Sequence, residues 1–127
     1  MDPVDIVKEG YSRYARRDFP GVFELLSEDV TIWQSDDVPW GGKYAGRAGA
    51  GEFFTKLAQY TAATPMPVTF IPAGNFVAVY GKLHGQATAT ETEFDLDFVH
   101  LWQVKDGKID RFEAFVDTPG MLAALGL

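Results

Sequence analysis

His100 is the side chain of this sequence best suited to proton chemistry. It lies in the aromatic stretch VHLWQVKDGKIDRF, residues 99–112. If that stretch is extended, the alternation of side chains puts Phe98, His100 and Trp102 on one face. A neutral imidazole beside an apolar cavity can give or take a proton near neutral pH. The same face would also suit a dimer interface, and we favour the pocket of these two interpretations.

Two other polar side chains need to be weighed beside His100. Tyr14 falls on the apolar face of an N-terminal helix, where its hydroxyl could polarise a carbonyl group, although a tyrosine there is also an ordinary core residue. His84 falls on a polar strand face, so we expect an exposed side chain. A turn near Thr92 would instead make His84 a direct cross-strand neighbour of His100.

A set of aromatic and apolar residues provides candidates for the pocket lining. Trp33 and Trp40 flank the segment SDD and could form the cavity mouth. The other candidates are Phe54, Phe98, Trp102, Phe112 and Val116. Ordinary aromatic packing is the alternative explanation for all of them. Asp95 and Asp97 share a strand face without a third ligand, and the glycines of YAGRAGAGEFF lack nucleotide-loop spacing, so we expect no metal and no cofactor.

The elements that would position these residues form an α+β pattern in a single domain, residues 1–127. Apolar spacings predict a helix near the N-terminus, a short helix after Asp18 that stops near Ser27, and a helix that carries Phe53 to Tyr60. Strands are predicted at 30–34, 67–73, 75–90, 93–104 and 108–117, with an irregular loop over 35–51. Thr118 and Pro119 begin a short terminal helix. Helices on one face of a curved antiparallel sheet leave a cone that can hold a small molecule.

The hairpin KDGK decides where His100 lies relative to the last strand. A type I turn followed by Gly107 in the left-handed region would make a three-residue bulged loop. This loop would set His100 beside Phe112 and Phe98 near Ala114.

Composition limits the classes of partner. The chain has 127 residues, no cysteine and a formal net charge of −7, which opposes nucleic-acid binding. No apolar run approaches the roughly 20 residues that span a bilayer, and the first ten residues lack the features of a signal peptide. We therefore expect a soluble, cytoplasmic protein that binds neither nucleic acid nor membrane.

The element order and three segments resemble a known family. DVTIW, YAGRAGAGEFF and VHLWQVKDGKIDRFEAFVD are similar to the SnoaL-like branch of the NTF2-like superfamily, relatives of ketosteroid isomerase. The resemblance covers nearly the whole chain and implies an NTF2-like cone with three helices in the N-terminal half. Because this fold hosts isomerases, cyclases, dehydratases, hydrolases and non-enzymatic binders, it implies no single reaction.

The isomerase's catalytic residues carry over poorly. Its aspartate base falls at about Gln34, and an amide cannot take a proton from carbon. Its tyrosine falls near Gly10, one turn before Tyr14, and its hydrogen-bonding carboxylic acid falls at about His100. Asp117 matches the aspartate that ends the last strand in SnoaL-like sequences, where an acid/base or histidine-orienting role is implied. Asp-Thr-Pro is equally a helix start, so Asp117 as a capping residue stays open.

These observations predict a cofactor-independent acid/base enzyme for a largely apolar, oxygenated ring compound. In it His100 would shuttle a proton, Asp117 would orient or charge it, and Tyr14 or Gln34 would hydrogen-bond the substrate oxygen. The alternatives are a non-catalytic binder of a small hydrophobic ligand, or a structural dimer with a filled cavity. We also expect a homodimer through the sheet, because short helices cannot cover both aromatic faces.

Overall fold

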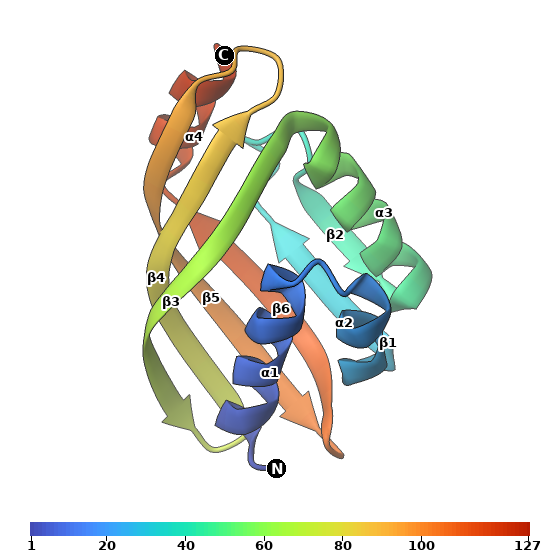
Figure 1. The fold of residues 1–127 in the computed structure, drawn as a ribbon. Coiled ribbons are helices and arrows are strands. Elements are labelled where there is room, and N and C mark those ends of the chain that lie inside the picture. The colour runs from blue at the N-terminus through green and yellow to red at the C-terminus, as the bar shows by residue number, and fades with distance from the viewer.

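The computed structural model describes residues 1–127 and shows four helices packed on one mixed, unclosed sheet (Figure 1). The helices are α1 (Pro3–Ala15), α2 (Phe19–Leu25), α3 (Gly46–Tyr60) and α4 (Thr118–Leu125). The strands are β1 (Leu26–Gln34), β2 (Gly42–Ala45), β3 (Thr61–Ala73), β4 (Phe76–Ala87), β5 (Glu93–Lys105) and β6 (Lys108–Val116). The predicted α+β cone is therefore confirmed.

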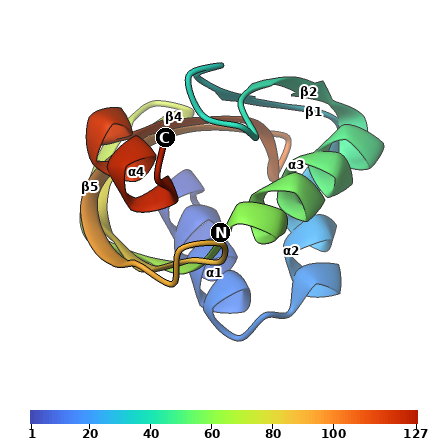
Figure 2. The ribbon, with the colours of Figure 1, turned by 90° about the horizontal axis from the view of Figure 1, so that it is seen from above.

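The sheet has the order β2-β1-β6-β5-β4-β3 and curves strongly. Seen from above, it forms an arc with α1, α2 and α3 on its concave side (Figure 2). All neighbouring strands are antiparallel except β1 and β6, which run parallel, so the sheet is mixed rather than wholly antiparallel as expected. Strand β2 lies within the predicted irregular loop, where its four residues are too few to show a pattern.

Aspartates begin three of the helices and explain where they start. The side chain of Asp2 accepts a hydrogen bond from the Asp5 main-chain N–H at 2.9 Å, and Asp18 accepts from that of Gly21 at 3.0 Å. Asp117 caps α4 in the same way, and a proline occupies one of the first two positions of α1, α2 and α4. These caps satisfy main-chain donors that the first helical turn leaves unpaired.

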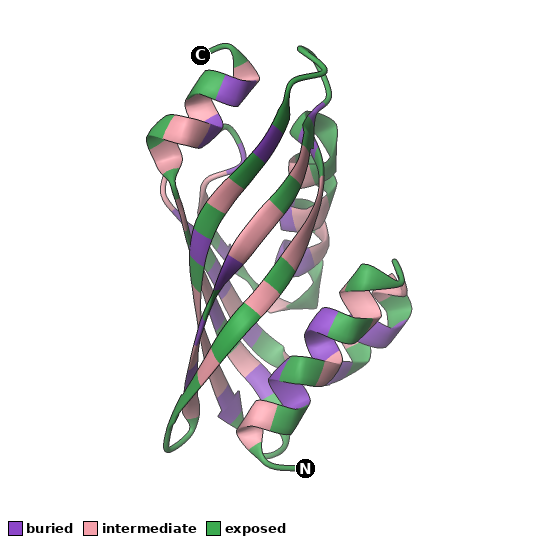
Figure 3. Cartoon of the chain, turned by 60° about the vertical axis from the view of Figure 1, so that its left-hand side comes forward, coloured by how far each residue is buried: buried purple, intermediate pink, exposed green.

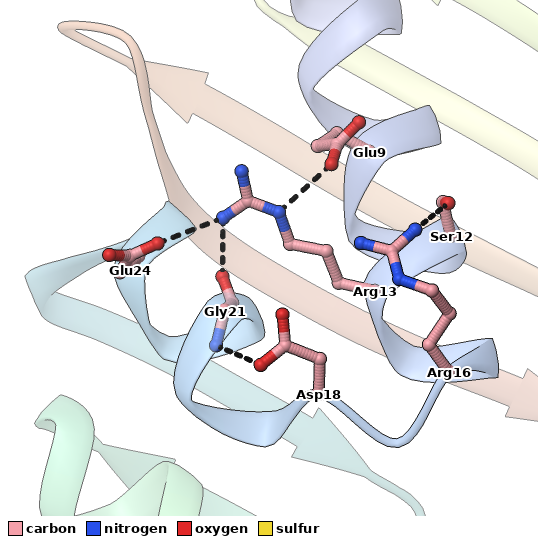
Figure 4. A network of polar contacts seen from close by, with 7 residues as sticks. All are labelled: Glu9, Ser12, Arg13, Arg16, Asp18, Gly21 and Glu24. Carbon is pink, nitrogen blue, oxygen red and sulfur yellow. Dashed lines mark hydrogen bonds and ion pairs between the residues drawn. The ribbon is translucent and has the colours of Figure 1, made fainter.

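Arg13 ties α1 to α2 and so fixes two walls of the cone (Figure 4). Its Nε donates to Glu9 Oε1 at 2.9 Å, and Nη1 donates to the main-chain oxygen of Gly21 at 2.7 Å. Nη1 also lies 3.2 Å from Glu24 Oε2. Because Glu24 is largely exposed and Glu9 partly exposed, we assign the ion pairs a small stabilising contribution and the contact with Gly21 the orienting one.

The lack of a side chain at Gly81 allows Phe98 to approach β4 closely. These residues are direct partners on β5 and β4, and a Cβ at Gly81 would clash with the main-chain oxygen of Met66 and lie 2.7 Å from the Phe98 ring. The pairing of β3 with β4 is irregular nearby, between Pro67 and Thr69, which is a place where the strand can bend. Side chains alternate between buried and exposed along the strands, as the colours of Figure 3 show. The even-numbered residues of β5 face the concave side, which buries Phe94 and Phe98.

The hairpin between β5 and β6 differs from the expected bulged loop. Lys105 pairs with Lys108 across a two-residue turn, and both turn residues have positive φ, 51° at Asp106 and 76° at Gly107. This is the type I′ geometry, which suits the twist of the strands. The positive φ of Gly107 is confirmed, whereas the bulge lies further along β6.

Asp110 is the extra residue of that bulge and restores the expected face of β6. Val104 pairs with Ile109, but Gln103 pairs with Arg111, so the inward residues of β6 change from odd to even positions. His100 therefore pairs with Ala114 rather than with Phe112, and Phe98 pairs with Val116 rather than lying near Ala114. The register is two residues from the expected one, which leaves the faces unchanged.

The turn predicts a stability difference between two glycines. Gly107→Ala should lower the free energy of unfolding by about 1 kcal/mol, because a Cβ there meets no atom but a residue with a side chain disfavours the left-handed region. Gly51→Ala is the matched control. Gly51 also has open space around it, but it lies inside α3, so alanine should stabilise by roughly 0.5 to 1 kcal/mol. Urea denaturation of the three proteins would contradict the turn assignment if both substitutions stabilise.

Candidate functional site

A cavity of about 100 Å³ lies between the concave face of the sheet and α1, α2 and α3. Seventeen of its 21 lining residues are hydrophobic, and none is Asp, Glu, Lys or Arg. Cavities of around 150 Å³ hold benzene in other proteins, so a single six-membered ring would fit here with a small movement of the lining side chains. The lining composition predicts a largely apolar, uncharged occupant.

His100 is at the end of a chain of hydrogen bonds at the cavity wall. Its Nδ1 lies 2.7 Å from Tyr11 Oη, and the Trp102 Nε1–H donates to the same Tyr11 oxygen at 3.0 Å. Tyr11 comes from α1 and the other two residues from β5, so the chain joins the helix to the sheet. All three side chains line the cavity.

The chain indicates which nitrogen of His100 carries the proton. The Trp102 indole can only donate to Tyr11 Oη, and His100 Nδ1 is the partner beside Tyr11 that can accept the hydroxyl proton. We infer that the neutral imidazole carries its proton on Nε2. This nitrogen makes no hydrogen bond within the protein, yet no fully buried side-chain nitrogen or oxygen is unpaired. We infer that Nε2–H is exposed to the cavity.

The surroundings of His100 keep it neutral. Its ring stacks on Phe98 with centroids 4.0 Å apart and meets the edge of Phe112 at 4.8 Å. Burial among these rings lowers the pKa of His100 from 6.5 to about 3, and no carboxylate lines the cavity to offset the effect. The imidazole can therefore donate a hydrogen bond to a ligand oxygen, but it is a weak base.

Gln34 and Tyr14 also line the cavity, without contacting His100. The Gln34 Oε1 accepts a hydrogen bond from the Trp40 Nε1–H at 2.9 Å. Tyr14 packs its ring against Phe54 and Phe19, and burial raises its pKa. Arg17 lies over the Tyr14 ring at 5.1 Å and partly opposes that rise. Both residues are where the sequence analysis expected them, and their roles stay predictions.

Asp117 does not take part in this site. Its carboxylate accepts a hydrogen bond from the Gly120 main-chain N–H at 3.0 Å and caps α4, and the side chain is exposed. It is absent from the residues that line the cavity. The prediction that Asp117 orients or charges His100 is therefore wrong, because the Asp-Thr-Pro segment uses the carboxylate to begin a helix.

The structure divides the predicted lining residues into two groups. Trp33 lies on the outer face of β1, where its ring packs 5.4 Å from that of Phe115. Its odd position on β1 turns it away from the cavity that Ile32 and Gln34 line, so it is not a mouth residue. The other predicted residues all line the cavity, namely Trp40, Phe54, Phe98, Trp102, Phe112 and Val116.

Tyr11 is the polar residue that the sequence analysis did not select. It precedes Tyr14 by three positions on the same apolar face of α1 and is 7% exposed. The resemblance placed the isomerase's tyrosine near Gly10, so Tyr11, one position away, was the closer candidate. Helical spacing alone could not separate the two tyrosines, because both face inward.

His84 lies away from the cavity. It is exposed on β4, where it pairs with Asp95 and Thr64, and His100 pairs with Val79 instead. The expectation of an exposed histidine is confirmed. The two histidines are not cross-strand neighbours, because the β4–β5 connection closes at Gln86 and Glu93, earlier than a turn near Thr92 requires. No three His, Cys, Asp or Glu side chains lie close enough to hold a metal ion, and no helix is long and apolar enough to span a bilayer.

Comparison with known proteins agrees with this geometry. The family model of the SnoaL-like domain matches residues 7–112. Among curated proteins, no significant match to the chain was found.

Solved structures resemble the whole chain. An NTF2-like protein of unknown function from Burkholderia pseudomallei is 27% identical, with a TM-score of 0.93 and coverage of 100% of this chain and 99% of the other. TerC, co-crystallised with polyporic acid, is 26% identical, with a TM-score of 0.91 and 98% of both chains covered. A protein with a ketosteroid isomerase-like fold from Catenulispora acidiphila is 18% identical, with a TM-score of 0.81 over 100% and 95% of the two chains. This last likeness shows the fold alone.

The buried imidazole predicts a specific dependence of stability on pH. His100 has a lower pKa folded than unfolded, so the unfolded chain binds more protons below pH 6.5 and stability falls as the pH drops toward 3. Between pH 7.5 and pH 5, this one group should cost the wild type about 2 kcal/mol.

Denaturation at the two pH values in His100→Phe and His84→Gln checks this cost. His100→Phe should lose about 2 kcal/mol less than the wild type, whereas His84→Gln, an exposed control position outside the cavity, should follow the wild type. Equal losses in all three proteins would contradict a buried, neutral His100. The ring nitrogen shifts of His100 at pH 5 should independently report a neutral ring protonated at Nε2.

Proposed function

Because the chain belongs to the SnoaL-like domain family, we propose that it is a cofactor-independent enzyme acting on a small, largely apolar ring compound with a carbonyl-type oxygen. The observation that carries the proposal is the hydrogen-bond chain from Trp102 through Tyr11 to His100, which ends in a cavity without charged groups. Such a buried polar chain is costly in an apolar wall unless its exposed end has a partner. A ligand oxygen is the partner that fits Nε2–H.

The chemistry follows from the protonation state of His100. A neutral imidazole that donates Nε2–H to a ring carbonyl stabilises the negative charge that develops on this oxygen when a neighbouring carbon loses a proton. The low-dielectric wall strengthens that hydrogen bond. Because no carboxylate lines the cavity, the departing proton goes to water or to a group of the substrate itself. This role fits isomerase, cyclase or dehydratase chemistry, in which an enolate is a shared intermediate.

A non-catalytic binding function is the second candidate. It is favoured by the absence of any charged acid or base in the cavity and by the use of Asp117 as a helix cap. TerC, a protein of similar fold, was co-crystallised with the small organic molecule polyporic acid. The two candidates share the binding mode and differ only in whether the bound compound reacts.

Cyclohexanone in D2O separates the two candidates. We expect cyclohexanone to perturb the His100 ring resonances. We also expect the α-protons of cyclohexanone to exchange with solvent deuterium faster in the presence of the wild type than in buffer alone. His100→Phe keeps the stacked ring but removes both nitrogens, so exchange should fall to the buffer rate while affinity drops by no more than about tenfold. Tyr11→Phe should show an intermediate loss, because the imidazole is then free to change tautomer.

His84→Gln is the control for these measurements and should behave as the wild type. Binding without accelerated exchange would support the binding function instead. No response of His100 to cyclohexanone would contradict both candidates.

The outer face of the sheet supports a proposal about assembly, a homodimer in which two sheets face each other. Val99 lies at its centre, with Tyr80 as its partner on β4 and Phe115 on β6, and all three are exposed. The ring of Trp33 extends this apolar row beside Phe115. A contiguous exposed apolar patch of this kind commonly marks an interface.

The dimer is tested by the mass in solution at micromolar concentration. We expect a dimer for the wild type and a monomer for Val99→Asp, because two carboxylates would meet in an apolar interface. His84→Asp places the same charge on the polar end of that face and should leave the dimer intact. A monomeric wild type would contradict this assembly.

A further inference from the structure

Gln34 has an amide group whose orientation is fixed by a second hydrogen-bond chain. Its Oε1 accepts the Trp40 Nε1–H at 2.9 Å, and an indole N–H can only donate, so the carbonyl oxygen must face Trp40. Trp40 is itself held in place, because it is 1% exposed and its main-chain oxygen accepts from Tyr44 Oη at 2.9 Å. The amide cannot turn over without losing this bond.

The other half of the amide is left for the cavity. Gln34 is 6% exposed, yet its Nε2 makes no hydrogen bond within the protein. No fully buried side-chain nitrogen or oxygen lacks a partner, so Nε2 retains accessible surface. Because Gln34 lines the cavity, this surface faces the same space as His100 Nε2. An unpaired donor here favours any ligand that brings an acceptor.

The sheet places Gln34 and His100 on either side of one small residue. Ala114 pairs with Gln34 on β1 and with His100 on β5, so the three form a row across the cavity floor. Two strand spacings separate the outer members by about 10 Å at the backbone, and both side chains turn inward from there. The methyl group of Ala114 leaves the space between the two donors open.

We infer that the cavity selects ring compounds that carry two acceptor oxygens, one bound by His100 Nε2–H and the other by the Gln34 amide N–H. Trp40 is the positioning residue that keeps Gln34 a donor. This inference rests on the proposed function for the first oxygen and adds the second. It also assigns Gln34, in place of an acid/base residue, to substrate selection.

Selection against hydroxyl groups follows from the same arrangement. The acceptor atoms of Gln34 and His100 are already used, Gln34 Oε1 by Trp40 and His100 Nδ1 by Tyr11. A ring diol could accept the two hydrogen bonds, but its own O–H groups would then find no free acceptor on either of these side chains. A buried unpaired hydroxyl is costly, so a dione should bind better than the matching diol.

The probes for this inference are cyclohexanone, 1,4-cyclohexanedione and 1,4-cyclohexanediol, with affinities from ligand-observed NMR. For the wild type we expect the dione to bind about tenfold more tightly than cyclohexanone, the size of one added hydrogen bond, and the diol to bind more weakly than the dione. Gln34→Met keeps the length of the side chain and offers Trp40 a weak sulfur acceptor, but it has no donor. In this variant the dione should lose its advantage over cyclohexanone.

Trp40→Phe tests whether Trp40 positions the Gln34 amide, because a purely structural role for Trp40 would not change the affinity of the diol relative to the dione. Without the indole N–H the Gln34 amide can turn its oxygen into the cavity, so the diol should gain affinity relative to the dione. If this variant does not fold, Gln34→Met alone decides. A wild type that binds cyclohexanone and dione equally, or a dione preference that survives Gln34→Met, overturns the inference while leaving the proposed function standing. If no probe perturbs His100, both fail together.

Discussion

The bond between Tyr11 Oη and His100 Nδ1 is the contact on which the site depends. It holds α1 against the floor of the cone, and the same bond fixes the protonated nitrogen of the imidazole. Trp102 supports it by donating to the same oxygen, so the three groups polarise one another in a region with little water. The same hydrogen bond thus packs α1 on the sheet and orients the imidazole. A shift of α1 would therefore change the geometry of the cavity wall.

A second constraint is that the acceptor atoms of His100 and Gln34 already have partners within the protein. Each of the two hydrogen-bond chains uses up an acceptor atom, on His100 or on Gln34, and each leaves N–H groups toward the cavity. The site therefore resembles an oxyanion hole without its base. Neutral donors avoid the desolvation cost of a buried charge. A cavity lined by no carboxylate or ammonium group stays uncharged over a wide pH range.

The sequence was informative wherever a pattern is local. Alternation along β5 and β6 predicted the inward face correctly, and Asp-Pro segments predicted the helix starts. It failed where the outcome depended on a partner distant in the chain. The choice between Tyr11 and Tyr14 depends on where α1 crosses β5, 89 residues away in the chain. The role of Asp117 depends on whether its carboxylate caps α4 or faces the cavity, and it caps α4. Trp33 needed the phase of β1, which a five-residue apolar segment does not fix.

The bulge at Asp110 gives this hairpin a place where it can change length during evolution. Ser27 Oγ donates to the Asp110 carboxylate at 2.9 Å, where the pairing of β1 with β6 is also irregular. Asp110 is the residue that the ladder leaves unpaired, so its loss would remove the bulge and leave Arg111 and the residues after it opposite the same partners on β5. A relative that is one residue shorter here should therefore keep Phe112 and Ala114 inward, whereas one residue lost after Arg111 would turn the rest of β6 over.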